Sequence, residues 1–279
     1  SCNALESIVL PDVLKELGES AFFDCTALYT VSLPDAVASV GEDVFYNNHM
    51  YQHIYIRYYT GSIADGLLEA QDMRVVVIDE NITSIGNRAF AECHKLMVIT
   101  YDYSRGDGEF YLSSNIKHIG EEAFANTTNL KNLFVPDTLM SVGANAFYNP
   151  IVSKYNVNDV TVTFYYVAGS IAADILKQQK IWHVTVCDNI HTIGDNAFNG
   201  ITTLDSVSLP DTIANCGNAV FANSGSKVVA YIRGVDGTVD DSVYNGKTDG
   251  LVGMDFDANV KTIGKYAIAG GNNEIIHIL

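Results

Sequence analysis

The chain repeats one seven-residue motif at a regular interval, and this repeat constrains the fold more than any other feature. "SIGNRAF" (84–90) returns as "HIGEEAF" (118–124), "SVGANAF" (141–147) and "TIGDNAF" (192–198). Aligning every copy places its glycine at Gly18, Gly41, Gly86, Gly120, Gly143, Gly194, Gly217 and Gly264. The successive spacings of 23, 45, 34, 23, 51, 23 and 47 residues indicate a 23-residue period with some incomplete copies. One unit of this length cannot close a core alone, so the period predicts coils that stack into a solenoid.

Side chains recur at fixed offsets around each glycine. Four residues after it an aromatic ring is found at Phe22, Phe45, Phe90, Phe124, Phe147, Phe198 and Phe221. Alternating segments such as "LYTVSLP" (28–34) lead to a proline, which predicts a short strand that ends there. We expect the glycine to allow a positive φ or a close backbone contact at a corner. We expect the Ala-Phe pair to begin a short helical or 3₁₀ stretch, with the rings stacked in a continuous aromatic spine.

A longer super-repeat accounts for the doubled spacings. Residues 55–86 resemble residues 163–194, and a decayed third copy begins at Tyr231. Both complete copies pass from a Tyr-rich strand to a Gly-Ser step and a segment that predicts an amphipathic helix of seven to nine residues. Ser62 and Ser170 are plausible N-caps of these helices.

The unit resembles the BspA-like class of leucine-rich repeats, whose pattern is approximately LxxIxIPxxVxxIGxxAFxxCxxL. "LYTVSLPDAVASVGEDVFYNN" (28–48) follows it almost position for position, and Cys25 and Cys93 stand at its cysteine position. The resemblance covers essentially the whole chain. It implies an α/β fold, a right-handed leucine-rich-repeat solenoid of short strands with short helical or 3₁₀ segments, as a single domain over residues 1–279 with about twelve coils. It also implies an extracellular or surface-attached protein of host-associated bacteria or mucosal protists that acts in adhesion or host interaction, with no catalytic residue to carry over.

Charge narrows the range of partners. The 279 residues carry a formal net charge of −17, which repels phosphate backbones and anionic lipid. We therefore expect no nucleic-acid partner and no membrane insertion, and no apolar run approaches the roughly 20 residues of a bilayer span. We also expect the chain to be part of a longer array, with any leader and anchor outside it.

The outward positions of the strands form the candidate partner-binding face. They vary between copies while the core positions do not, and their aromatic members would suit a protein or a glycan. Exposed strand aromatics also arise from β-propensity and cross-strand pairing alone. The candidate residues are Tyr29, Ser32, Gln52, His53, Tyr55, Lys131, Phe134, Asp205, Ser208 and Tyr231.

Short motifs add weaker candidates. The insertion "DYSRGDGEF" (102–110) contains Arg105, Gly106 and Asp107, the integrin-binding tripeptide, although Gly and Asp are also ordinary turn residues. Asn81 and Asn126 begin glycosylation sequons, which matter only in a secreted eukaryotic protein.

The cysteines and histidines indicate neither a metal site nor catalysis. The evenly spaced His183, Cys187 and His191 fall on predicted strand and turn. Cys2 and Cys25 lie one period apart, so they are either stacked thiols or, less favoured, a disulfide. No order of residues suggests a nucleophile with its base.

We therefore expect no metal, no cofactor and no enzyme. The leading hypothesis is a recognition module for a protein on a host or neighbouring-cell surface. The alternatives are a carbohydrate- or cell-wall-binding protein that uses outward tyrosines as stacking platforms and, less favoured, an intracellular scaffold.

Overall fold

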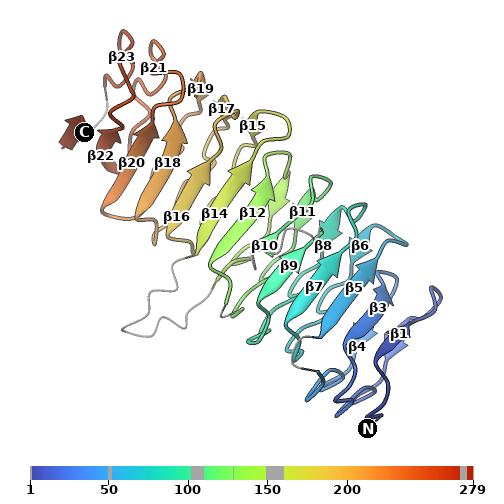
Figure 1. Cartoon of the computed structure of the whole chain (residues 1–279). Helices are drawn as coiled ribbons and strands as arrows, with labels where there is room; N and C mark the ends of the chain where they lie inside the picture. The colour runs from blue at the N-terminus through green and yellow to red at the C-terminus, as the bar shows by residue number, and fades with distance from the viewer. Residues whose placement is uncertain are drawn as a thin grey trace. The chain divides into compact units, whose positions relative to one another are not determined.

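The protein is seen here as a computed structural model that describes residues 2–49, 52–101, 110–127, 129–148, 160–270 and 275–278. Its contacts divide the chain into two compact units. Unit 1 comprises residues 1–133 and 142–158, and unit 2 comprises residues 134–141 and 159–279. Each unit is a right-handed solenoid in which every coil contributes one long strand to a parallel sheet (Figure 1).

Unit 1 has a sheet of long strands and, on the opposite side of each coil, short two-residue strands. The long strands pair in register, so that Thr30 lies beside His53 and Ser32 beside Tyr55. They are β1 (Ser7–Val9), β3 (Thr30–Pro34), β5 (His53–Arg57), β7 (Val75–Ile78), β9 (Val98–Thr100) and β10 (Phe110–Tyr111). The short strands are β2 (Glu16–Leu17), β4 (Ser39–Val40), β6 (Ser62–Ile63), β8 (Ser84–Ile85) and β11 (His118–Ile119). Strands β12 (Asn132–Pro136) and β13 (Ser141–Val142) contain the points where the chain passes between the units.

Unit 2 repeats this plan. Its long strands are β14 (Thr161–Tyr165), β16 (His183–Val186), β18 (Ser206–Pro210), β20 (Val228–Arg233), β22 (Leu251–Phe256) and β24 (Ile275–Ile278). Its short strands are β15 (Ser170–Ile171), β17 (Thr192–Ile193), β19 (Asn215–Cys216), β21 (Thr238–Val239) and β23 (Thr262–Ile263).

The core holds the apolar strand residues and the repeated rings. Phe90 stacks on Phe124 with ring centroids 5.5 Å apart, and Phe124 stacks on Phe147 at 6.1 Å. In unit 1 the buried Leu68 takes the ring position of the super-repeat coil, between the coils of Phe45 and Phe90. The expected aromatic spine is therefore present as shorter stacks separated by leucine.

The expected helical segments are wrong. Among the residues that the structure describes there is no helix, and so none that could cross a membrane. Ser62 and Ser170 begin the short strands β6 and β15 instead of capping helices. The reason lies two and six residues after the motif glycines, where the backbone of the described residues is left-handed. In the opening motif these are Arg88 (φ 53°) and Glu92 (φ 59°), and a right-handed helix cannot contain them.

The left-handed residues turn alternate N–H groups toward the next coil. The N–H groups of Arg88, Phe90 and Glu92 each donate over 2.8 Å to the carbonyls of Glu121, Ala123 and Ala125 respectively. The intervening Ala89 and Ala91 instead close turns on carbonyls three residues earlier. We call this arrangement the turn ladder. It joins coils on the side opposite the long strands, whereas a helix would use all of these donors within its own coil.

The motif glycines allow a close approach of coils, and none of the described ones has a positive φ. A Cβ on Gly86 would lie 2.6 Å from the carbonyl carbon of Ala64 and from the amide nitrogen of Asp65 in the preceding coil. Gly18 has no such neighbour, because no atom of the described residues lies within 4 Å of its Cβ position. Close contact with the preceding coil, and not turn geometry, therefore explains the recurring glycine.

Each super-repeat coil is connected to the coil before it by a different interaction, a buried carboxylate that accepts backbone N–H groups. The buried carboxylates of Asp35, Asp137 and Asp211 accept backbone N–H groups from the next long loop, and we call these joints carboxylate seams. Asp35 accepts from Thr60 and Gly61, each over 2.7 Å. At this seam the short strands β4 and β6 belong to different ladders. The carboxylate thus replaces backbone pairing between neighbouring coils.

We predict that Gly86→Ala destabilises the chain by about 3 kcal/mol, because the added methyl group meets rigid backbone. Gly18→Ala is the matched control, since it occupies the same repeat position in open space and should change stability by less than about 0.5 kcal/mol. Urea unfolding followed by circular dichroism measures both values. Equal costs for the two substitutions would contradict the close-approach explanation.

We also predict that Asp35→Ala lowers the free energy of unfolding by about 3 kcal/mol, because two N–H groups lose a buried charged acceptor. Asp12 holds the same position after a proline, but it is exposed and pairs with Arg57 at 2.7 Å. Asp12→Ala should therefore cost less than about 1 kcal/mol. The same unfolding experiment compares them, and a cost at Asp12 as large as at Asp35 would argue against the carboxylate seam.

Candidate functional site

Four rings of unit 1 come together beside strands β3 and β5, two of them within β5 and two just outside the strands. The ring centroid of Tyr29 lies 4.7 Å from that of His53 and 5.5 Å from that of His49, and His53 lies 6.1 Å from Tyr55. We call Tyr29, His49, His53 and Tyr55 the aromatic–histidine cluster. The register of β3 and β5 produces it, since His53 and Tyr55 project from one strand on the same side.

The members of the cluster differ in exposure. Tyr29 is 41 % exposed, whereas His53 is buried and its removal from water lowers its pKa from the usual 6.5. The hydroxyl of Tyr55 lies 3.5 Å from Nδ1 of His53. The cluster therefore presents a tyrosine to solvent above a histidine that favours its neutral form, which suits contact with an apolar or aromatic group.

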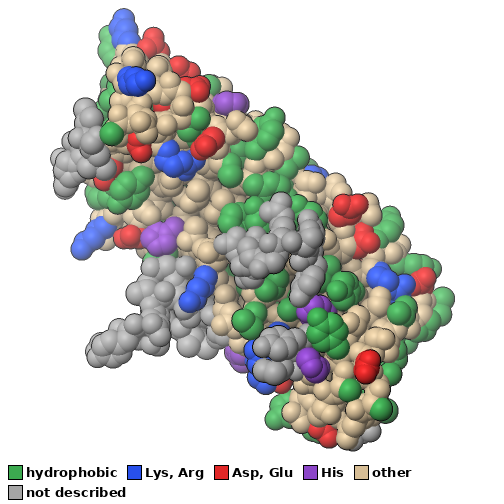
Figure 2. Space-filling model, viewed as in Figure 1, with side chains coloured by type: hydrophobic (Ala, Val, Ile, Leu, Met, Phe, Trp, Pro, Cys, Tyr) green, Lys and Arg blue, Asp and Glu red, His purple; other side chains and the backbone are tan. Residues whose placement is uncertain are grey.

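Two hollows flank the cluster within unit 1. One, of about 610 Å³, is lined by Glu6, Ser7, Ala27, Tyr29, Thr30 and His49. The other, of about 310 Å³, is lined by Tyr55, Ile56, Arg57, Val77, Ile78, Asp79, Glu80 and Tyr101. Figure 2 shows hydrophobic and histidine side chains close together over the N-terminal strands of this face. The face is thus uneven enough to receive side chains of a partner on both sides of the cluster.

The other sequence candidates of unit 1 add no ring to the cluster. Ser32 is nearly buried in the row that also contains Tyr55. Gln52 precedes β5 and is only 1 % exposed, so its side chain does not face solvent. Lys131 is exposed just before β12.

The remaining strand candidates belong to unit 2. Phe134 is half-buried within β12, and Asp205 is exposed just before β18. Ser208 pairs in register with the exposed Tyr231, and its hydroxyl accepts a hydrogen bond from Arg233 at 2.6 Å. The ten predicted residues therefore form no single site. Tyr29, His53 and Tyr55 are the ones brought together in unit 1, and sequence reasoning omitted His49 because it lies outside a strand.

The loop candidates Arg105, Gly106 and Asp107 lie outside the described residues. Of the two sequon asparagines, Asn81 is exposed and its amide donates to Asp79 over 2.9 Å, whereas Asn126 is half-buried.

The cysteines are free thiols. The backbone N–H of Cys2 lies 3.3 Å from Sγ of Cys25, so the two residues are neighbours in adjacent coils without a disulfide. Burial raises the pKa of Cys93 and of Cys216 to about 12, which leaves both thiols protonated and unreactive at neutral pH. The described part of the chain contains no group of three or more His, Cys, Asp or Glu placed to hold a metal ion.

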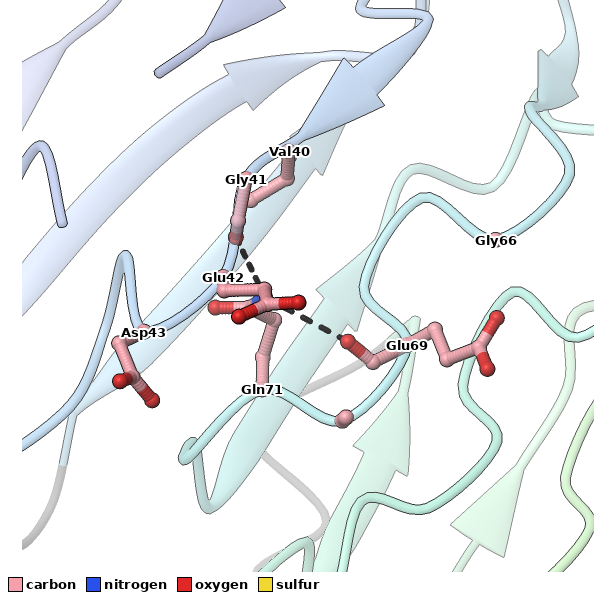
Figure 3. A pocket seen from close by; sticks show the side chains of 8 residues that line it. Val40, Gly41, Glu42, Asp43, Gly66, Glu69 and Gln71 are labelled. Carbon is pink, nitrogen blue, oxygen red and sulfur yellow. Dashed lines mark hydrogen bonds between the residues drawn. The ribbon is translucent and has the colours of Figure 1, made fainter. Parts of the chain in front are cut away.

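A polar cavity of about 450 Å³ lies on the turn side of unit 1, between the turn of Gly41 and that of Gly66. It is lined by Val40, Gly41, Glu42, Asp43, Gly66, Glu69, Ala70 and Gln71. Figure 3 shows the amide of Gln71 reaching across it to the carbonyl of Gly41, a contact of 2.9 Å. Glu69 and Asp43 point away from each other, and Glu69 pairs with Arg88 at 2.6 Å. The cavity therefore presents no converging set of ligands.

Comparison with known proteins identifies the same kind of repeat along the chain. A family model described as "BspA type Leucine rich repeat region" matches residues 1–105, 107–167 and 169–278 in six copies. A search of curated proteins gives no significant match.

Several solved structures are similar over most of the chain. A leucine-rich cell surface protein from Faecalibacterium prausnitzii is 18 % identical with a TM-score of 0.31, over 98 % of this chain and 87 % of that one. The pneumococcal vaccine antigen PcpA is 16 % identical with a TM-score of 0.36, over 99 % and 76 % respectively. A leucine-rich repeat protein from Bacteroides ovatus is 17 % identical with a TM-score of 0.29, over 96 % and 74 %. The identities and TM-scores are too low to say anything about function. The family of the chain is assigned from the family model alone.

Proposed function

Because the chain belongs to the BspA-type leucine-rich repeat family, we propose that it is a non-catalytic recognition module, extracellular or at a cell surface, that binds a protein partner through the aromatic–histidine cluster of unit 1. The observation that carries the proposal is the packing of Tyr29, His53 and Tyr55 on the long-strand side, between two hollows. Adhesion to a host or neighbouring cell is the use that fits such a module.

The physical case begins with the rings. Tyrosine carries a large contact area on few rotatable bonds, so it loses little entropy when a partner covers it. Tyr29 is held against His49 and His53, which limits its freedom before binding. A residue that is both ordered and exposed is the kind that dominates the energy of protein interfaces.

The scaffold adds rigidity. The pairing of β3 with β5, and of β5 with β7, fixes the spacing of outward side chains along the sheet. Side chains of a partner could enter the flanking hollows while the cluster contacts the surface between them. Such a surface is preorganised, which reduces the cost of binding.

Charge indicates the kind of partner. With a net charge of −17, the chain attracts basic surfaces and repels acidic ones. Glu6 lines one hollow, and Asp79 and Glu80 line the other. The proposed partner surface is therefore an apolar or aromatic patch surrounded by Lys or Arg, and its binding should weaken as salt increases.

The test uses an array of purified extracellular and cell-surface proteins, followed by biolayer interferometry on each protein that binds. We predict that Tyr29→Ala combined with Tyr55→Ala raises Kd by about 30-fold or more, the loss of one strong anchor of roughly 2 kcal/mol. The rings are removed from the surface without changing the buried core of the coils.

The matched control is Tyr46→Ala combined with Tyr148→Ala, which removes two exposed tyrosines from the turn side of the same unit. This control should bind like the native chain. Equal loss of binding in both double variants, or none in either, would contradict recognition through the cluster.

A further inference from the structure

The super-repeat places the same exposed tyrosine on a rigid loop in each unit. The loop after β5 contains Gly61 (φ 89°), and the loop after β14 contains Gly169 (φ 86°). Tyr58 and Tyr166 stand three residues before these glycines and are 53 % and 52 % exposed. The same side chain therefore occupies the same turn twice in the chain.

Each ring lies against its glycine. A Cβ on Gly61 would lie 3.5 Å from Cε2 of Tyr58, and one on Gly169 would lie 3.6 Å from Cε2 of Tyr166. These distances place an edge atom of each ring beside the open position where any other residue would carry its Cβ. About half of each tyrosine stays open to solvent.

The carboxylate seams keep these loops rigid. Asp35 accepts the N–H groups of Thr60 and Gly61, and Asp137 accepts those of Ala168 and Gly169. All four donors lie within three residues of Tyr58 or Tyr166. The charged acceptors thus fix the turn on which the ring stands, and a ligand need not order it.

Polar groups of the following coil lie near the same two glycines. The backbone carbonyl of Asn81 lies 4.0 Å from the Cβ position of Gly61, and that of Asn189 lies 3.5 Å from the Cβ position of Gly169. Thr83 adds a hydroxyl beside Gly61, 3.8 Å from the same point. An aromatic ring edge and a backbone carbonyl therefore both lie within about 4 Å of one point at each glycine.

The third super-repeat copy lacks this arrangement. Gly234 replaces the tyrosine, and a Cβ there would lie 2.6 Å from Cβ of Asn259. The turn itself is retained, because Asp211 still accepts the N–H of Gly237 at 2.7 Å. The fold therefore does not need a ring at this position, and the tyrosines of the other two copies are available for another role.

We propose that Tyr58 and Tyr166 are stacking platforms for neutral pyranose sugars, in β-linked oligosaccharides whose rings present a face of C–H groups. The electron-rich face of the tyrosine attracts these C–H groups, and the neighbouring carbonyls accept hydrogen bonds from the sugar hydroxyls. The charge of −17 selects against sulfated or sialylated chains. This site is separate from the aromatic–histidine cluster and does not depend on it.

The test is ligand-observed NMR with cellohexaose and chitohexaose, together with spectra of the chain labelled at tyrosine. We expect saturable binding in the millimolar range and shifts of the Tyr58 and Tyr166 ring signals. Tyr58→Ala combined with Tyr166→Ala should weaken binding at least tenfold. Tyr58→Phe combined with Tyr166→Phe should keep it, since phenylalanine preserves the ring.

Two controls separate this proposal from the protein-binding one. Tyr29→Ala combined with Tyr55→Ala should bind the sugars like the native chain, and a heparin hexasaccharide should not bind. Unchanged sugar binding in the Tyr58 and Tyr166 alanine variant would overturn the proposal. Absence of binding to either neutral oligosaccharide, or preference for heparin, would also overturn it.

Discussion

The turn ladder is the interaction on which the rest of the structure depends. Strand pairing alone would join the coils along the long strands and at the two-residue short strands, and would leave the turns that follow the short strands unjoined. The alternating left-handed residues direct half of the local N–H groups, such as those of Phe90 and Phe124, to the next coil. Backbone bonds then hold both sides of the stack, and the motif glycine allows coils to approach closely enough to form them.

The carboxylate seams are where this regular pairing gives way. Asp35 and Asp211 each take over the donors of a long loop, at the places where the short strands belong to different ladders. The exposed Tyr58 stands on the loop that the Asp35 carboxylate holds, three residues before Gly61. Regular coils supply rigidity, and the exceptions supply surface features that a partner could distinguish.

Much of this could be predicted from the sequence, because the period and the alternation of Leu28, Val31 and Leu33 follow directly from burial. That the Ala-Phe segments form turns and not helices could not be predicted, since the Ala-Phe motif fits a helix equally well. Asn196 and Gly200, which tolerate left-handed backbone, were the available signal at the two decisive offsets. The candidate face was predicted only in part. Tyr29 and Tyr55 follow from strand alternation, but the burial of Gln52 and the approach of His49 depend on how neighbouring coils pack.

The most direct test of this account is a measurement of scalar couplings across hydrogen bonds by NMR on the deuterated chain. If the turn ladder joins the coils, the amide nitrogen of Phe90 couples to the carbonyl carbon of Ala123 in the next coil, 33 residues later. A coupling from Phe90 to the carbonyl of Gly86, four residues earlier, would instead show a helix within one coil and would contradict the account.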